Sequence, residues 1–327
     1  MNHDGDGNDG NAAGDTAGRM PTEIGGYRIQ RMLGSGGMAT VYAALQKQPR
    51  RTVALKVMRG AGMSGSDAAL RRFKREIEIL GRLNHPYIAQ VYAAGGHEDA
   101  GGPVPYFVME YVPGGKTLLE YAAAKELSLR DRLKIFVKVC AAVEHGHQRR
   151  IIHRDLKPGN ILIDEQGEPR IIDYGVAYAV EIDAALTTMA ADAGRLVGTI
   201  QYMAPEQLDV GGADLDARCD VYALGAVLYK LVTGRSMHDL TGLPVLTAVQ
   251  VVKEEAPARP STVAPAVKGD LETIIRTAIA KDRMRRYRSA GSLGRDIVRY
   301  LGAKPIKARP AGRLHRARLF MKRRRTE

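Results

Sequence analysis

The stretch from Ile151 to Gly175 constrains the fold of this 327-residue chain more than any other part of its sequence. A polar run, HRDLKPGN (153–160), is followed by the apolar run ILI (161–163), a turn, the run RII (170–172) and the tripeptide DYG. Short isoleucine-rich runs joined by a turn are typical of strands, so the polar residues are expected on loops at strand ends. Two carboxylates, an amide and a lysine on such loops can hold metal ions and orient a hydroxyl nucleophile.

The residues before this stretch predict a small sheet with one helix. Five short runs carry β-branched or aromatic residues and are separated by glycine-rich or polar turns. Between the third and fourth runs, apolar residues recur at spacings of three and four from about Asp67 to Leu83, which predicts a helix. The expected strands, which we predict to be antiparallel, are 27–33, 39–45, 51–58, 88–94 and 104–112.

The rest of the chain predicts a mostly helical part. The expected helices lie near 117–125, 128–149, 219–234, 244–254, 270–280 and 289–301. Residues 176–200 are small and polar without strong periodicity, so we expect a long functional loop there. The fold class predicted from these patterns is α+β, with a small lobe of five strands and one helix, a larger helical lobe, and residues 151–175 between them.

Both ends of the chain differ from its middle in composition. Residues 1–20 are rich in Gly, Asn and Asp with almost nothing large and apolar, so we expect a disordered leader over 1–25. The net charge is +13, and the ten Lys/Arg and one Glu of residues 303–327 supply +9 of it, leaving +4 for 1–302. The predicted domain therefore spans 26–302, with lobes 26–111 and 112–302, and 303–327 is a basic tail.

The lack of long apolar runs and the small number of cysteines suggest the cellular compartment. No apolar run approaches the roughly 18 residues of a membrane-spanning helix, so no transmembrane segment is expected. Cys140 and Cys219 lie in different expected helices without metal-ligand spacing, which favours buried thiols in a reducing compartment. We expect a cytoplasmic protein, and the basic tail leaves a membrane-peripheral location open.

A glycine-rich segment, LGSGGMATV (33–41), joins the first two expected strands. Glycines there allow main-chain N–H groups to approach phosphate oxygens, although a simple hairpin turn gives the same pattern. Lys56 lies inside an apolar strand, where a surface lysine is the common alternative. A lysine beneath a glycine-rich turn can hold phosphates if a carboxylate fixes it, and Glu76 or Glu78 of the next expected helix can do so.

Several motifs in the same order identify a family. The glycine-rich turn, VALK (53–56), HRDLKPGN, DYG and APE (204–206) together resemble the Hanks-type (eukaryotic-like) Ser/Thr protein kinases. The segments GSGGMATVY and GTIQYMAPE are most similar to bacterial members. The resemblance covers roughly residues 26–302 and implies the two-lobed protein kinase fold, with transfer of the ATP γ-phosphoryl group to protein hydroxyls.

The resemblance assigns roles to individual residues of the nucleotide site. Lys56 would contact the phosphates and pair with Glu76, because FKRE (73–76) resembles the family's helix signature. Met109 would be the gatekeeper, Glu110 and Val112 would bind adenine through the main chain, and Ala54 and Leu162 would sandwich the ring. The phosphate loop would comprise Leu33, Gly34, Ser35, Gly36, Gly37 and Val41. The implied cofactors are ATP and Mg²⁺, with Mn²⁺ as an alternative metal.

The resemblance also assigns the catalytic residues. Asp155 would orient the substrate hydroxyl, and Lys157 would neutralise charge on the transferred group. Asn160 and Asp173 would hold the metal ions. His153 is expected to pack beneath Tyr174 rather than to act as a base.

Scaffold and regulatory roles follow from the same family. Asp220 is expected to brace the catalytic loop, and Glu206 to pair with Arg286. Arg154 beside Asp155 implies regulation by activation-loop autophosphorylation, with Thr187 and Thr188 as acceptors. Thr199 would hydrogen-bond Asp155 and Lys157.

Two positions depart from the family's pattern. Ala39 replaces the third glycine of the phosphate loop, and Tyr174 replaces a phenylalanine, which is tolerable if its hydroxyl finds a partner. Because Lys56, Asp155 and Asp173 are all present, we expect an active kinase. The alternatives are a nucleotide-binding pseudokinase or scaffold acting through the basic tail, and a small-molecule phosphotransferase, which usually lacks the equivalents of Lys157 and of the APE segment.

The expected partners are protein substrates and a second copy of the chain paired through the small lobe. Residues 303–327 could contact an anionic membrane or nucleic acid, or could be a solvated charge run.

Overall fold

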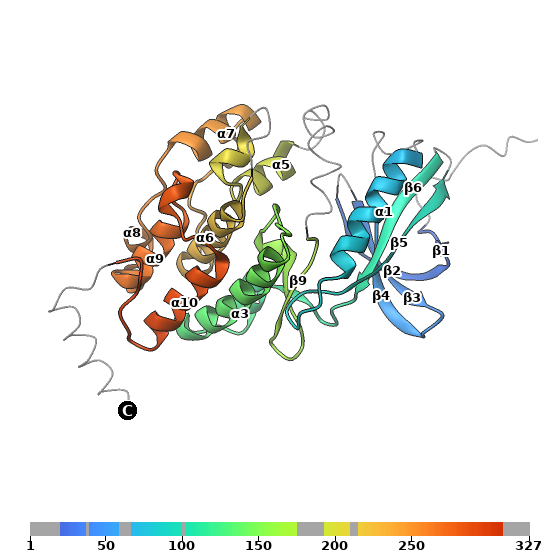
Figure 1. Cartoon of the computed structure of the whole chain (residues 1–327), viewed down its shortest axis with the longest axis horizontal. Coiled ribbons are helices and arrows are strands. Elements are labelled where there is room, and N and C mark those ends of the chain that lie inside the picture. Colours follow the sequence, from blue (N-terminus) through green and yellow to red (C-terminus); the bar gives the residue numbers. More distant parts are fainter. Residues whose placement is uncertain are drawn as a thin grey trace, which may run out of the picture.

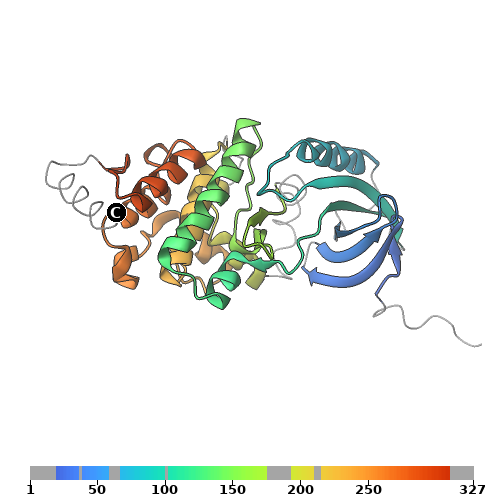
Figure 2. The ribbon, with the colours of Figure 1, turned by 90° about the horizontal axis from the view of Figure 1, so that it is seen from below.

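The computed structural model describes residues 20–36, 39–58, 67–99, 102–174, 193–209 and 215–309. It has a small lobe built on a sheet and a larger helical lobe, joined near residue 111 (Figures 1 and 2). This arrangement confirms the two-lobed fold class. Gly37, Thr187 and Thr188, three of the predicted site residues, lie outside the described residues.

The small lobe contains a six-stranded antiparallel sheet in the order β1-β2-β3-β4-β6-β5. Its strands are β1 Glu23–Ile24, β2 Tyr27–Ser35, β3 Ala39–Gln46, β4 Arg51–Met58, β5 Val91–Asp99 and β6 Gly102–Glu110. Five strands were predicted, and the sixth is the two-residue β1. Ile24 of β1 is buried against β2, so the ordered domain begins before residue 26 and the predicted leader was drawn too long.

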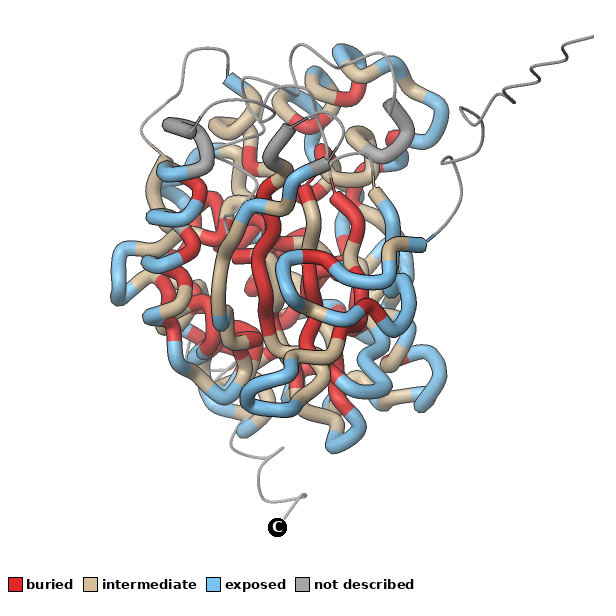
Figure 3. The backbone as a smooth tube through the Cα atoms, turned by 90° about the vertical axis from the view of Figure 1, so that its right-hand side faces the viewer, coloured by how far each residue is buried: buried red, intermediate tan, exposed pale blue. Residues whose placement is uncertain are grey.

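Strand register decides which residues of the small lobe face the second lobe. In β4, Val53 and Leu55 are buried in one apolar cluster, whereas Ala54 belongs to the other. Because side chains alternate along a strand, Lys56 shares the face of Ala54. Helix α1 (Asp67–Gly81) packs Phe73 and Ile77 onto that same face, and the buried residues of the central strands are visible in Figure 3.

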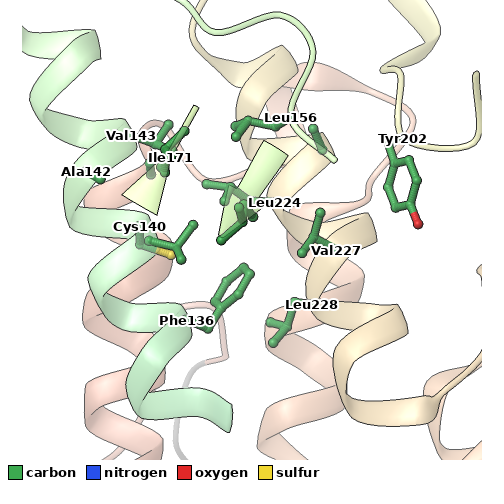
Figure 4. Packing of buried hydrophobic residues seen from close by; sticks show 14 of the residues in the cluster. Phe136, Cys140, Ala142, Val143, Leu156, Ile171, Tyr202, Leu224, Val227 and Leu228 are labelled. Carbon is green, nitrogen blue, oxygen red and sulfur yellow. The ribbon is translucent and has the colours of Figure 1, made fainter. Parts of the chain in front are cut away.

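The large lobe is built around one buried helix. In α6 (Arg218–Thr233), 12 of the 16 residues are buried, which is typical of a helix surrounded by others. Phe136 of α3 packs toward Val227 and Leu228 of α6 (Figure 4). The other helices are α2 Leu118–Ala124, α3 Leu129–Gln148, α5 Ala193–Ile200, α7 Val245–Glu254, α8 Pro260–Val263, α9 Asp270–Ala278 and α10 Ala290–Leu301. Short 3₁₀ helices are Pro158–Asn160, Pro205–Leu208, Pro265–Val267 and Arg283–Arg285.

A second small sheet carries the catalytic stretch. Strands β7 (Lys116–Thr117), β8 (Ile161–Ile163) and β9 (Pro169–Ile171) pair in that order. Ile171 also bridges to Ile88, which lies just before β5. The strands predicted around the organising stretch are therefore present, and they tie the loop after α1 to the stretch.

One segment of the large lobe that was predicted as loop is a helix in the structure. Residues 193–200, predicted as part of a long loop, form α5, whose Leu196, Val197 and Ile200 join an apolar cluster with Ala248 and Val252 of α7. The poor helical periodicity of that segment hid this, because tertiary packing rather than local pattern stabilises α5.

The basic tail begins later than predicted. Ile306 is buried, and the N–H groups of Lys307 and Ala308 donate to the Asp296 carboxylate at 2.8 and 2.9 Å. Residues 303–308 therefore belong to the folded lobe. Within the described ranges, no helix has the length and apolar character needed to cross a membrane.

Candidate active site

Asp220 fixes the backbone of the catalytic loop. This carboxylate, 1% exposed at the start of α6, accepts hydrogen bonds from the main-chain N–H of His153 and of Arg154, both at 2.8 Å. It also contacts His147 Nε2 at 2.7 Å. Burial by itself raises the pKa of Asp220, but the bond and charge of His147, with the N–H of His153, outweigh it and hold the pKa below the usual value. The predicted bracing role is confirmed.

The loop backbone is held in conformations that ordinary residues rarely adopt. Arg154 and Asp173 have φ angles of 66° and 59°, in the left-handed region. Such conformations persist only where the surroundings impose them, and they cluster at functional sites. The Asp220 bond at Arg154, and that of Gln207 Nε2 to the Arg154 carbonyl at 2.9 Å, impose the first of them.

His153 and Tyr174 are buried and pack against each other with tilted rings beneath the site. Their ring centroids lie 4.6 Å apart, and Tyr174 donates a hydrogen bond to the Ala142 carbonyl at 3.1 Å. Gly146 makes room for this ring, because a Cβ there would lie 2.9 Å from it. Burial lowers the pKa of His153 by more than the surrounding carboxylates raise it. The imidazole is therefore neutral, and its role is structural. Both predictions, the packing of His153 and a partner for the Tyr174 hydroxyl, are confirmed.

Asp155 lies in a polar cluster at the end of the loop. Its Oδ2 is 2.9 Å from Lys157 Nζ and accepts a hydrogen bond from Asn160 Nδ2 at 3.0 Å. Asn160 also donates to the Asp155 carbonyl at 2.8 Å. Lys157 donates to Thr199 Oγ1 at 3.3 Å, which confirms half of the predicted Thr199 contacts; the bond to Asp155 stays a prediction. The cluster thus joins residues 155–160 to α5.

Lys56 reaches from the small lobe to Asp173. The Lys56 Nζ to Asp173 Oδ2 distance is 2.9 Å, and the two side chains are 15% and 17% exposed. This pair brings β4 against the loop after β9 and so closes the two lobes on one another. The side chain of Glu76, the predicted partner of Lys56, lies outside the described residues, so that pairing stays a prediction.

The oxygen atoms present fit a hard divalent cation. Asp173 Oδ1 and Asp155 Oδ1 are buried and have no hydrogen-bond partner among the described residues. The side-chain amide of Asn160 donates hydrogen bonds to Asp155, so its side-chain oxygen can serve as a metal ligand. No group of three or more His, Cys, Asp or Glu in the described ranges could hold a metal unaided. Mg²⁺ typically needs only one or two carboxylates when substrate phosphates complete its shell.

Apolar residues from both lobes flank the predicted adenine position. Ala54 and Met109 face each other across β4 and β6 and are each 4% exposed, and Val112 is also buried. Leu162 lies on β8 in the other lobe and is half-buried. A cavity of about 10 Å³, room for one water molecule, is lined by Met109, Asp173 and Tyr174 among others. Glu110 ends β6 and leads into the connection between lobes.

The glycine-rich segment is the hairpin between β2 and β3. Gly34 pairs with Val41 and Ser35 with Thr40, and Gly36 N–H donates to the Ala39 carbonyl at 2.7 Å. A side chain added at Gly34 would meet nothing within 4 Å, so packing within the chain does not require a glycine at this position. Leu33 precedes it and is 38% exposed.

Several supporting residues could not be found from the sequence. Arg31 on β2 donates to the Tyr111 hydroxyl at 2.7 Å and so ties the hairpin to the connection between lobes. Gln207 bonds the catalytic loop at the Arg154 carbonyl, and His147 bonds Asp220, which holds that loop; neither stands in a motif considered above. The predicted Glu206–Arg286 pair is confirmed as a two-point contact at 2.6 and 2.8 Å.

A two-lobed fold with a glycine-rich hairpin, a strand lysine and two loop carboxylates is the arrangement found in nucleotide-dependent phosphotransferases. Comparison with known families agrees: the protein kinase domain family matches residues 27–293. The chain therefore belongs to the protein kinase domain family.

Bacterial protein kinases are among the curated relatives of this chain. The probable serine/threonine-protein kinase PknB of Bifidobacterium longum is 40% identical over 299 residues, which cover 88% of this chain and 42% of that protein. Serine/threonine-protein kinase PknB of Mycobacterium tuberculosis is 37% identical over 284 residues, 86% of this chain and 44% of that protein. The chain thus spans less than half the length of these relatives. The predicted resemblance to bacterial Hanks-type kinases is confirmed.

A solved structure shows the same fold. The PknI kinase domain of Mycobacterium tuberculosis superimposes with a TM-score of 0.64 at 26% sequence identity, covering 86% of this chain and 98% of that one.

Proposed function

We propose that this chain is an ATP-dependent protein kinase that phosphorylates serine and threonine hydroxyls. The observation that carries the proposal is the pair of carboxylates, Asp155 and Asp173, each 2.9 Å from its own lysine. Such a site offers positioning and charge, which is what phosphoryl transfer requires. Support comes from the family and from the names of the bacterial relatives.

The residues of the site divide the work of phosphate transfer among them. Asp155 accepts the hydrogen bond of the substrate hydroxyl and takes its proton as the new O–P bond forms and the bond from the γ-phosphorus to the β,γ-bridging oxygen breaks, which releases ADP. Lys157 and Lys56 offset the negative charge of the phosphoryl oxygens. Asn160 and Asp173 are the residues that would hold Mg²⁺ or Mn²⁺, and the bound metal neutralises phosphate charge. The hairpin residues from Leu33 to Val41 cover the phosphates through main-chain N–H groups.

The adenine ring is expected between Ala54 and Leu162, with Met109 behind it and the main chain of Glu110 and Val112 at its edge. Ala54 and Met109 are buried on the sheet, and Leu162 approaches from the second lobe, so the ring would be sandwiched by both lobes. The Thr199 to Lys157 contact favours a serine or threonine acceptor held beside α5.

The test is phosphate transfer from γ-labelled Mg-ATP to the chain itself and to a general protein acceptor. Asp155→Asn should lower the rate by about 10²–10⁴-fold, the typical contribution of a positioned base. Asp239→Asn, at an exposed loop carboxylate, is the matched control and should transfer at the wild-type rate. Equal transfer by wild type and Asp155→Asn would refute the proposal and favour a nucleotide-binding scaffold.

Regulation is proposed through the activation segment. Arg154 beside Asp155 would receive a phosphate placed on Thr187 or Thr188, and so couple the state of the loop to the catalytic residues. Mass spectrometry after incubation with Mg-ATP should find both threonines modified in the active chain and neither modified in Asp155→Asn. An active chain with both unmodified would contradict this.

Further partners are proposed for the small lobe and the tail. Back-to-back pairing of small lobes would give a homodimer, detectable as a doubled mass in analytical ultracentrifugation.

The basic tail would bind anionic membranes, giving a cytoplasmic, membrane-peripheral protein, with nucleic acid as the competing ligand. Co-sedimentation with anionic vesicles, repeated with nucleic acid as competitor, separates these partners.

A further inference from the structure

A groove on the outside of the helical lobe is not used by the proposed reaction. It lies between α3 and α10, which pack along each other (Figures 1 and 2), and has a volume of about 520 Å³. Its apolar wall on α3 consists of Val137, Cys140 and Ala141. Gly291, Gly294 and Val298 face it from α10. Pockets of roughly 300–1,000 Å³ with mostly apolar walls are typical of small-molecule sites.

Small residues keep the groove open while the helices stay close. A Cβ at Gly294 would lie 3.0 Å from the Cβ of Cys140, so the two backbones approach as near as a glycine allows. Ala141 is exposed at the groove and Val298 is 52% exposed. The apolar residues of the groove are therefore partly exposed to solvent, and none of them is large enough to fill it.

Positive charges predominate at the groove. Among the described residues, Arg295, Arg299 and Lys304 line it, and the Glu144 carboxylate lies against its lining at the Gly291 end, where it accepts a hydrogen bond from the Gly291 N–H at 2.8 Å. Arg295 and Arg299 are one helical turn apart, so they stand on one flank of the stripe formed by Gly291, Gly294 and Val298. The Lys304 N–H donates to the Arg299 carbonyl at 2.7 Å, which places Lys304 near the same end of α10.

These cations are only weakly neutralised within the chain. Arg295 donates to the Ser292 hydroxyl at 2.9 Å, which is a neutral partner. Arg299 Nε is 3.8 Å from Asp296 Oδ1. That carboxylate is already engaged by the Tyr287 hydroxyl and by two main-chain N–H groups. Positive charge is therefore available beside an apolar floor.

We propose that this groove binds one long-chain carboxylate, with the alkyl chain along the floor and the carboxylate on Arg295, Arg299 and Lys304. The floor from Gly291 to Gly302 is about 16 Å long at 1.5 Å per residue, which suits a single extended alkyl chain. A peptide fits less well, because the lining side chains offer its main-chain groups no acceptor stronger than a thiol. An alkyl chain has no such groups to satisfy.

The test is calorimetric titration of the full chain with dodecanoate below its micelle concentration. Wild type should bind one molecule per chain, and dodecanol, which lacks the charge, should bind at least tenfold more weakly. Arg295→Gln/Arg299→Gln should weaken dodecanoate binding about tenfold or more, because two charge-assisted contacts are lost. The matched control, Arg276→Gln/Arg285→Gln, removes two exposed arginines elsewhere in the same lobe and should bind as wild type.

Two further variants address the floor. Ala141→Leu fills the groove at an exposed helical position and should abolish saturable binding. Val298→Asp should do the same by placing a carboxylate beside the ligand's own. Unchanged thermal unfolding of each variant shows that the lobe still folds, and two floor variants guard against either one misfolding.

Absence of saturable binding to wild type would overturn the proposal. So would equal loss in the control pair, or dodecanoate binding that both floor variants leave unchanged. If dodecanoate does not bind, and anionic phosphatidylglycerol vesicles bind wild type more strongly than Arg295→Gln/Arg299→Gln, these two arginines form a membrane-binding surface beside the basic tail and the groove has no ligand of this class. None of these readouts depends on kinase activity, so the result stands apart from the proposed function.

Discussion

The Asp220 carboxylate accepts a hydrogen bond from the main-chain N–H of Arg154 at 2.8 Å, across 66 residues of sequence. With the N–H of His153 on its other oxygen, Asp220 shapes two consecutive residues of the catalytic loop. The residue that follows them is Asp155, so the position of the proposed base depends on a carboxylate in α6 that touches no substrate.

Asp220→Ala should therefore lower both stability and activity. It leaves two buried N–H groups and His147 without their acceptor, and breaking such a buried network costs on the order of 3–5 kcal/mol of unfolding free energy. Chemical denaturation followed by circular dichroism measures this. Asp239→Ala, at an exposed carboxylate, is the control, and an Asp220→Ala protein as stable as that control would contradict the bracing role.

Lys56→Met should lower phosphate transfer by about 100-fold or more, because it removes a positive charge aimed at the phosphates in a partly desolvated site. Stability should change by no more than about 1 kcal/mol, because the Lys56–Asp173 pair keeps some contact with solvent. Lys47→Met removes a surface lysine of the same lobe and should leave transfer unchanged. If Lys56→Met transferred phosphate at the wild-type rate, Lys56 would have no role in the reaction.

Thr199→Ala should reduce turnover about 10- to 100-fold, since a hydrogen bond to the charged Lys157 is worth roughly 1.5–3 kcal/mol. Thr199→Ser keeps the hydroxyl and should restore most of the activity. Steady-state kinetics on a threonine peptide measure both. Failure of the serine variant to recover activity would indicate that the methyl group, through packing of α5, is what matters.

Tyr174→Phe should remain active, because the ring keeps its buried position over His153 and only the hydroxyl bond to Ala142 is lost. We expect a loss of about 1 kcal/mol in unfolding free energy. Tyr174→Ala, which leaves a cavity, should cost about 3–5 kcal/mol. If a folded Tyr174→Phe protein were inactive, the Tyr174 hydroxyl would be required for activity and not only for packing.

His238 should make stability depend on pH. Burial, together with the positive charge of Lys281, lowers the pKa of His238 to about 4. Burial also lowers the pKa of Lys281, to about 8, so this lysine is still charged at neutral pH. The neutral imidazole is favoured in the fold, so its contribution is complete above pH 6.5 and is lost as the pH falls toward 4.

Between about pH 7 and pH 5, wild type should lose on the order of 1 kcal/mol more stability than His238→Gln, allowing for partial solvent screening. Denaturation curves at the two pH values give the difference. Parallel pH dependence in both proteins would show that His238 does not titrate in this range.

Much of the site was readable from the sequence because its residues are close together there. Asp155, Lys157 and Asn160 fall within six positions, and the structure joins them by direct contacts. The strand positions of Ala54 and Lys56 followed from alternation. The exceptions were segments whose form depends on distant partners: β1, which exists by pairing with β2, and α5, whose glycines and β-branched residues favour no helix by themselves.

The sequence by itself determined the chemical groups of this protein, their order along the chain and the two lobes that carry them, because periodicity and turn residues act locally. Only the tertiary structure decided which groups meet. The Lys56–Asp173 pair, the Arg31–Tyr111 bond and the groove between α3 and α10 each join segments far apart in the chain. Such contacts are set by packing of whole elements, which no local pattern encodes.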